Sequence, residues 1–129
     1  MTIDDALLDK ITAEAEASPR LRMNFNLHDS LDAKAQRLLN VLLPGTPLPV
    51  HRHNHTAETY VLLRGKMSVI FYNDRGKEIE RHRLDPAQGN YGVQIPKGQW
   101  HGVEVTEPST IFEVKDGPYT PLTADDILA

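Results

Sequence analysis

The sequence predicts an all-β fold, a sandwich, jelly roll or small barrel, with one amphipathic helix at its N-terminus. Beyond Pro19 the helical period disappears, and short segments rich in Val, Ile, Leu, Tyr and Phe alternate with clusters of Gly, Pro, Asn and Asp. Eight or nine such segments fit into roughly 110 residues, which is typical of folds that close or protect the edges of their sheets. The 129 residues, with no cysteine, form one domain that can bury a core without a disulfide or a structural metal.

The N-terminal helix is predicted over residues 3–17. Apolar side chains recur there every four residues between Asp, Glu and Lys, which gives one face that can pack on the outside of a larger structure. Thr2 is the predicted N-cap, with Asp5 as a weaker capping-box partner, and Pro19 ends the helix.

The predicted strands are short and rich in β-branched and aromatic side chains. They are residues 21–27, 36–43, 49–53, 57–64, 66–73, 77–84, 92–96, 100–106 and 109–115. The segment Asn73–Gly76 is predicted to form a tight hairpin with its glycine at positive φ. The expected organisation is a helix in residues 1–19, a barrel in residues 20–117 and a tail in residues 118–129, where a turn leads to a short terminal helix.

Charge and hydropathy argue against two classes of partner. The chain has 14 Lys plus Arg against 18 Asp plus Glu, a formal net charge of -4, which disfavours nucleic acid. The longest apolar runs, Tyr60–Leu63 and Val69–Tyr72, are four residues each, far short of the roughly 20 that cross a bilayer. The acidic N-terminus does not resemble a secretory signal and cysteine is absent, so a cytoplasmic location is expected.

A cluster of histidines predicts a metal site. In a strand, His51 and His53 point to the same face, and Glu58 follows after a short bend. His101, which begins another predicted strand, can supply a fourth ligand. Imidazoles plus one carboxylate suit a divalent transition metal such as Fe, Zn, Ni or Mn, and coordination positions left open would make the site reactive rather than structural.

The other histidines have less specific surroundings. His55 shares the face of His53 and is either a ligand or a group at the rim of the site. His28 either has a structural role or lines the pocket, whereas His82 lies in a charged strand and is interpreted as an ordinary exposed histidine.

Two motifs of the cupin superfamily are recognisable in the chain. The first, G-x5-H-x-H-x3,4-E-x6-G, is matched at every defined position by Gly45, His51, His53, Glu58 and Gly65. The second, G-x5-P-x-G-x2-H-x3-N, is matched in its centre by Pro96, Gly98 and His101, while Asn90 and Val105 replace its flanking Gly and Asn. The resemblance implies a cupin double-stranded β-helix, a jelly-roll barrel, whose mouth holds a metal on His51, His53, Glu58 and His101.

Three further segments resemble the WbuC-type cupin metalloproteins. They are Ser18–His28, Gln36–Leu39 and Pro49–His53. This resemblance implies a link to gene clusters for bacterial surface polysaccharide, notably the O-antigen of lipopolysaccharide. It also implies candidate substrate-binding residues in the segment before the barrel: Arg20, Arg22, Asn24, Asn26 and His28. Tyr60 is added as a group that can stack on a ligand or donate a proton.

The leading functional hypothesis is a small metalloenzyme acting on an anionic, sugar-like or sugar-nucleotide-derived small molecule. The metal would act as a Lewis acid, and Arg22 or Arg52 would hold the anionic group of the ligand. An isomerase or epimerase would use His55 or His28 as a base, whereas an oxygenase would need a redox-active metal. The sequence does not separate these reactions, and the catalytic residues are not assigned.

Three other functions stay open. The chain can be a non-catalytic module that binds or senses a small ligand, a structural partner in a polysaccharide-assembly complex, or a metal-free epimerase. A homodimer is also expected, because the predicted strand 21–27 can cover an exposed sheet edge of a second subunit.

Overall fold

The computed structural model describes residues 1–128 as one helix followed by six strands and two short 3-10 helices. The elements are α1 (Asp5–Glu16), β1 (Arg22–Asn26), β2 (Ala35–Leu42), β3 (Glu58–Tyr72), β4 (Glu78–Leu84), η1 (Pro86–Gln88), β5 (Gly92–Ile95), β6 (Trp100–Asp116) and η2 (Ala124–Asp126). All strand pairs are antiparallel, in the order β1-β2-β6-β3-β4, with β5 paired to β3. The predicted all-β jelly-roll barrel with an N-terminal helix is confirmed.

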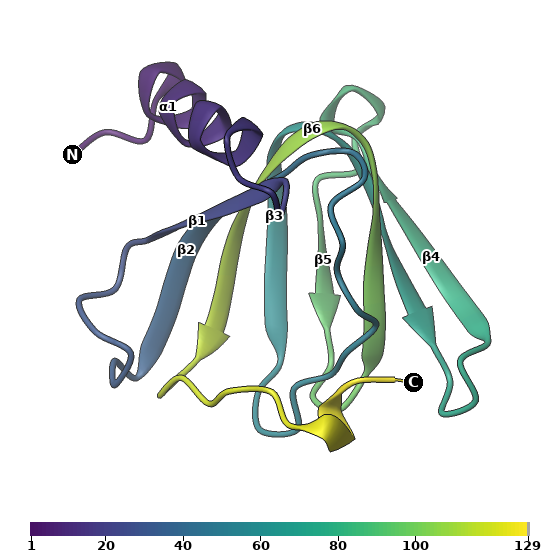
Figure 1. Cartoon of the computed structure of the whole chain (residues 1–129). Helices are drawn as coiled ribbons and strands as arrows, with labels where there is room; N and C mark the ends of the chain where they lie inside the picture. The colour runs from purple at the N-terminus through teal and green to yellow at the C-terminus, as the bar shows by residue number, and fades with distance from the viewer. Residues whose placement is uncertain (129) are drawn as a thin grey trace.

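The two longest strands, β3 and β6, pair along their whole lengths and bend together in the middle. Figure 1 shows β6 arching over the top of the barrel. The bend in β3 lies between Leu62 and Met67, where the pairing register shifts, and Gly65 has a φ of 102°. A Cβ on Gly65 would overlap the carbonyl oxygen of Pro108 and lie 2.5 Å from Ser109 Oγ. Four of the predicted strands therefore combine into two bent ones, because the close approach at Gly65 lets the pairing continue around a corner.

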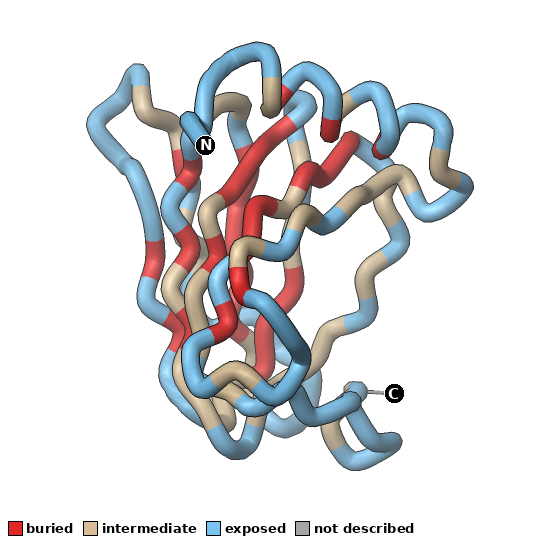
Figure 2. Tube along the Cα trace, turned by 90° about the vertical axis from the view of Figure 1, so that its left-hand side faces the viewer, coloured by how far each residue is buried: buried red, intermediate tan, exposed pale blue. Residues whose placement is uncertain are grey.

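The apolar residues form two clusters. The larger one fills the barrel, and Figure 2 shows buried positions concentrated along the strands. It consists of Leu42, Tyr60, Leu62, Met67, Val69, Phe71, Leu84, Val93, Ile95 and Ile111. The smaller one joins α1 to the outside of β1 and β2, as expected for the amphipathic helix, and Ile11 at its centre is 1% exposed.

Two local predictions are wrong. The N-cap of α1 is Asp4, whose Oδ1 accepts a hydrogen bond from Leu7 N at 2.9 Å, rather than Thr2. Residues 49–53 do not form a strand, because only His51 makes β-bridges, one to His101 and one to Ile127. The predicted hairpin at Asn73–Gly76 is confirmed, with a φ of 79° at the glycine.

The chain after β6 crosses the end of the barrel opposite to α1, as the yellow segment in Figure 1 shows. Tyr119 N donates to Leu31 O at 2.7 Å, and Leu128 N donates to Val50 O at 2.9 Å, so both ends of this C-terminal segment (residues 117–128) are held. The predicted short terminal helix is η2. No helix within residues 1–128 has the length and apolar character needed to cross a membrane.

Candidate metal centre

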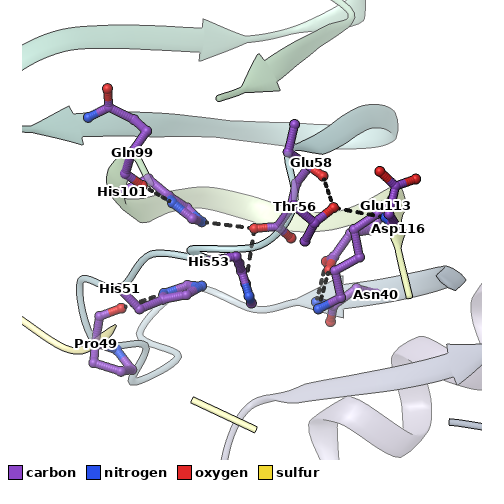
Figure 3. Close-up of polar contacts among 12 residues, drawn as sticks. Asn40, Pro49, His51, His53, Thr56, Glu58, Gln99, His101, Glu113 and Asp116 are labelled. Carbon is purple, nitrogen blue, oxygen red and sulfur yellow. Dashed lines mark hydrogen bonds and ion pairs between the residues drawn. The ribbon is translucent and has the colours of Figure 1, made fainter. Parts of the chain in front are cut away.

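Four side chains from three parts of the chain meet at the mouth of the barrel. Glu58, at the start of β3, has its Oε1 3.1 Å from His53 Nε2 and 3.4 Å from His101 Nε2. Figure 3 shows both imidazoles directed at this carboxylate. One ligand atom each from His51, His53 and Glu58 lie within 4.8 Å of one another, and the ring centroids of His51 and His101 are 4.4 Å apart. The arrangement can hold one metal ion.

Backbone contacts orient the imidazoles. His51 and His101 exchange two backbone hydrogen bonds, at 3.0 and 2.9 Å, which hold the loop of His51 against the start of β6 although neither His51 nor His53 lies in a strand. The Nδ1 atoms of His51 and His101 each lie 3.0 Å from a carbonyl oxygen, of Pro49 and Gln99. Because a carbonyl only accepts hydrogen bonds, each neutral ring carries its proton on Nδ1 and leaves the lone pair of Nε2 free for a metal.

The donor set fits a divalent transition metal. Glu58 Oε1 and His101 Nε2 are buried, face each other and have no hydrogen-bond partner within residues 1–128. Two lone pairs directed at each other in a buried site repel unless a cation or proton lies between them. Three imidazoles and one carboxylate suit Fe, Zn, Ni or Mn rather than Mg or Ca.

The ionisation states also suit metal binding. Burial, followed by the nearby His101, lowers the pKa of His51 to about 4, so its imidazole is neutral at pH 7. Burial alone would raise the pKa of Glu58, but the close imidazoles of His101 and His53 outweigh this effect, and the pKa lies well below its usual value. The centre therefore combines neutral imidazole with an ionised carboxylate.

The metal centre opens into a pocket of about 200 Å³, called here the metal pocket. Its lining includes Arg20, Arg22, Asn24, Asn40, Tyr60, Glu113 and Lys115. The arginine ion pairs within residues 1–128 are made by Arg52, Arg64 and Arg81, so neither Arg20 nor Arg22 has a carboxylate partner there. Partial burial and the charge of Arg20 lower the pKa of Arg22, because the two cations are close together.

Sequence reasoning missed several lining residues, among them Asn40, Glu113 and Lys115. Asn40 Nδ2 donates to Glu113 Oε1 at 3.5 Å, and Lys115 Nζ lies 3.8 Å from the other carboxylate oxygen. Burial, then the charge of Glu58, raises the pKa of Glu113 to about 8. Glu113 pairs with Tyr60 across β6 and β3. The strand alternation of β6 was visible in the sequence, but this pairing was not.

The structure places the predicted substrate-binding residues unequally. Arg22, Asn24 and Tyr60 line the metal pocket, while Asn26 and His28 do not. β1 ends at Asn26, and His28 is a buried residue of the otherwise mostly exposed loop that follows, where its Nδ1 accepts from Arg37 N at 3.1 Å.

Two other side chains that the sequence analysis considered, Arg52 and His55, lie near the metal centre but do not line the metal pocket. Arg52 packs over the ring of Trp100 at 4.2 Å and donates to Asp125 O at 3.1 Å. His55 is exposed, lies outside the ligand group and faces a neighbouring cavity instead.

Solved structures of cupin proteins share this fold. The chain is similar to CapF, a capsular polysaccharide assembling protein from Staphylococcus aureus, with a TM-score of 0.66 and 19% identity over 81% of this chain and 28% of CapF. It is also similar to TT1209 from Thermus thermophilus, with a TM-score of 0.63 and 24% identity over 90% and 97% of the two chains. A cupin-2 domain containing protein from Shewanella frigidimarina matches with a TM-score of 0.56 and 17% identity over 73% and 79%.

The fold and the histidine–glutamate cluster thus define a protein of cupin fold with a candidate metal site, as the two sequence motifs predicted. Residues 3–84 match the model of a family described as a domain of unknown function, DUF6016, and the chain belongs to this family. No protein of curated function matches the chain. The chain spans little more than a quarter of the length of CapF, so the likeness to that protein establishes the fold.

Proposed function

We propose that this chain is a small metal-dependent enzyme acting on an anionic sugar or sugar-nucleotide-derived substrate in the assembly of bacterial surface polysaccharide. The observation that carries the proposal is one pocket lined both by Glu58 with its imidazoles and by Arg20 and Arg22, which have no carboxylate partner within residues 1–128. The likeness to a capsular polysaccharide assembling protein and the resemblance to WbuC-type cupins support the pathway.

Each part of the pocket has a distinct task in this proposal. His51, His53, Glu58 and His101 hold the metal, which supplies Lewis-acid chemistry to a substrate oxygen when it is bound. The guanidinium of Arg22 binds the carboxylate or phosphate of the substrate, because planar N–H donors match two oxygens at once. Its Nη1 donates to Pro47 O at 2.6 Å, which fixes the side chain in place.

The pocket also offers a buried acceptor for a hydroxyl group. Asn40 Oδ1 is buried without a hydrogen-bond partner within residues 1–128, and Asn40 lines the metal pocket. A substrate hydroxyl that donates to this oxygen removes the cost of leaving it unpaired. An anionic ligand with hydroxyl groups, such as a uronic acid or a sugar phosphate, meets all three requirements of the pocket.

Elemental analysis tests the metal centre first. Protein purified without added metal should carry about one equivalent of Fe, Zn, Ni or Mn, and a His51→Ala, His53→Ala double variant should carry little. His82→Ala is the matched control, because it removes an imidazole that pairs with Glu80 on the surface. Equal and negligible metal in all three proteins would reject the metal centre.

Turnover separates an enzyme from a non-catalytic module that binds or senses a ligand. Metal-loaded protein incubated with sugar nucleotides, sugar phosphates and uronic acids should yield product by NMR, and folded His53→Ala should not. Uptake of solvent deuterium into the product identifies an isomerase or epimerase, while oxygen consumption identifies an oxygenase. Ligand binding without product under any metal would support the binding module.

We also propose a cytoplasmic homodimer. β1 lies at one end of the strand order and pairs only with β2, so its outer edge can accept a strand of a second copy. Light scattering should give about twice the chain mass of 14.5 kDa, and a mass near 14.5 kDa would reject the dimer.

A further inference from the structure

A second cavity, of about 310 Å³, adjoins the metal pocket and is called here the outer cavity. It lies between the loop after His53 and the start of the C-terminal segment. The two cavities are neighbours, because five residues line both of them: His53, Lys115, Tyr119, Thr120 and Leu122. None of the functions considered so far uses this space.

We propose that the outer cavity is a second sugar-ring subsite and that the ligand is an anionic saccharide of at least two rings. This inference rests on the proposed function, because the first ring occupies the metal pocket. The volume of the metal pocket alone, about 200 Å³, is below the range of roughly 300–1,000 Å³ that is typical of small-molecule sites. The combined volume of the two cavities falls within this range.

The chemistry of the outer cavity matches the faces and the rim of a sugar ring. Its lining includes the apolar and aromatic residues Pro118, Tyr119, Pro121 and Leu122. The lining also includes the polar residues Asn54, His55, Thr56 and Asp116. A pyranose ring has C–H groups on its faces and hydroxyl groups on its rim, so it can pack on the apolar residues and hydrogen-bond to the polar ones.

The polar lining residues of the outer cavity keep hydrogen-bonding capacity for a ligand. Within residues 1–128, the imidazole of His55 and the carboxylate of Asp116 form neither a hydrogen bond nor an ion pair. Asn54 uses its Nδ2 to bind Asp126 Oδ1, at 2.7 Å, which leaves its amide oxygen as an acceptor. A carboxylate and an amide oxygen accept hydrogen bonds from vicinal hydroxyl groups, which a saccharide supplies.

The outer cavity is held in its shape by contacts on either side. Tyr119 N donates to Leu31 O, and further along the segment Asp126 accepts hydrogen bonds from Thr123 and Asn54. Arg52 N also donates to Asp126 O at 3.0 Å, which ties the segment to the loop that carries His51 and His53. A preformed cavity costs less ordering on binding, so a second ring would add to the affinity.

Calorimetry with matched ligands tests the inference on the metal-loaded full chain. The probes are a set of hexuronic acids and hexose phosphates, the disaccharides that contain them, and the corresponding nucleotide sugars. At least one disaccharide should bind at least tenfold more tightly than its parent monosaccharide. His55→Ala and Asp116→Ala change residues that line only the outer cavity. Each variant should bring the ratio of disaccharide affinity to monosaccharide affinity close to one without changing metal content.

His82→Ala is the control and should keep the parent ratio. Monosaccharide binding with no gain for any disaccharide, or a gain that survives both variants, would overturn the outer subsite and leave the proposed function intact. A gain confined to nucleotide sugars would overturn the saccharide assignment. Absence of binding by every probe in metal-loaded protein would overturn the substrate class and this inference with it.

Discussion

At the end of the barrel beside α1, β3 and β6 turn so closely that Gly65 has no room for a Cβ. Ser109 Oγ donates there to Glu107 O at 2.8 Å, and Arg64 Nη2 lies 2.8 Å from Asp9 Oδ1 of the helix. At the opposite end, the same two strands carry Glu58 and His101, whose facing polar atoms lack hydrogen-bond partners within residues 1–128. One end satisfies its polar groups within the chain, and the other leaves them for a ligand.

The difference separates what folds this protein from what it does. A jelly roll needs the bend near Gly65 because both ends of β3 must lie at the same mouth of the barrel. The bend brings Glu58, at the start of β3, close to the end of β3, which pairs with His101. Changes at the bend should therefore lower stability without altering ligand preference. Changes at the mouth should alter ligand binding without lowering the stability of the metal-free protein. Four predictions test this division, beginning with the largest effect.

Gly65→Ala should lower the free energy of unfolding by roughly 3 to 5 kcal/mol, because it adds a steric overlap with Pro108 to a strained φ. Urea denaturation of the metal-free protein measures this loss. Gly89→Ala is the matched control, since Gly89 has a φ of 81° but no atom within 4 Å of the added Cβ. It should cost roughly 1 to 2 kcal/mol from the φ alone. Equal losses in the two variants would show that the bend is not tightly packed.

Metal binding should stabilise the folded protein through the residues at the mouth of the barrel and not through those at the bend. At free metal 100-fold above its dissociation constant, the free energy of unfolding should rise by about 2.7 kcal/mol, since the unfolded chain lacks the preformed site. Glu58→Gln should lose most of this increment, because it removes the carboxylate charge from the buried centre.

The bend variant Ser109→Ala should retain the full increment, since the side chain that it removes donates to Lys66 O and Glu107 O at the opposite end of the barrel. Loss of the increment in Ser109→Ala, or its retention in Glu58→Gln, would break the division between the two ends. Thermal unfolding with and without metal gives the comparison.

The sequence predicted which residues form the metal centre better than it predicted how the fold brings them together. Motif spacing identified His51, His53 and Glu58, although the predicted strand at 49–53 does not exist. Their convergence depends instead on backbone bonds between His51 and His101, which lie 50 positions apart and cannot be seen in local alternation.

The same limit explains the errors elsewhere in the barrel. Gly65 resembles a break between two strands, because a sequence pattern does not show that pairing resumes after a register shift. Glu113 was missed because its burial depends on the neighbour that β3 supplies, Tyr60, and on Asn40 from β2. Residues whose role is set by a contact distant in sequence were the ones that pattern reasoning did not assign.

A smaller effect is expected where the C-terminal segment meets the mouth. Asn54→Ala removes the hydrogen bond to Asp126 Oδ1 and should open the segment locally, with roughly tenfold faster amide exchange at Leu128. Exchange in the core of β3 should not change. Unchanged exchange at Leu128 would show that the other bonds of the segment are sufficient to hold the outer cavity closed on that side.

The smallest effect concerns α1, at the end of the molecule away from the metal centre. Asp4→Ala should cost about 1 kcal/mol, because the Oδ1 that caps Leu7 N at 2.9 Å is lost. Thr2→Ala should cost almost nothing, since Thr2 precedes the N-cap. Urea denaturation distinguishes the two variants, and metal content should equal that of the parent in both. A larger cost for Thr2→Ala would restore the capping inferred from the sequence, whereas lost metal in Asp4→Ala would show that the two ends are coupled through the barrel.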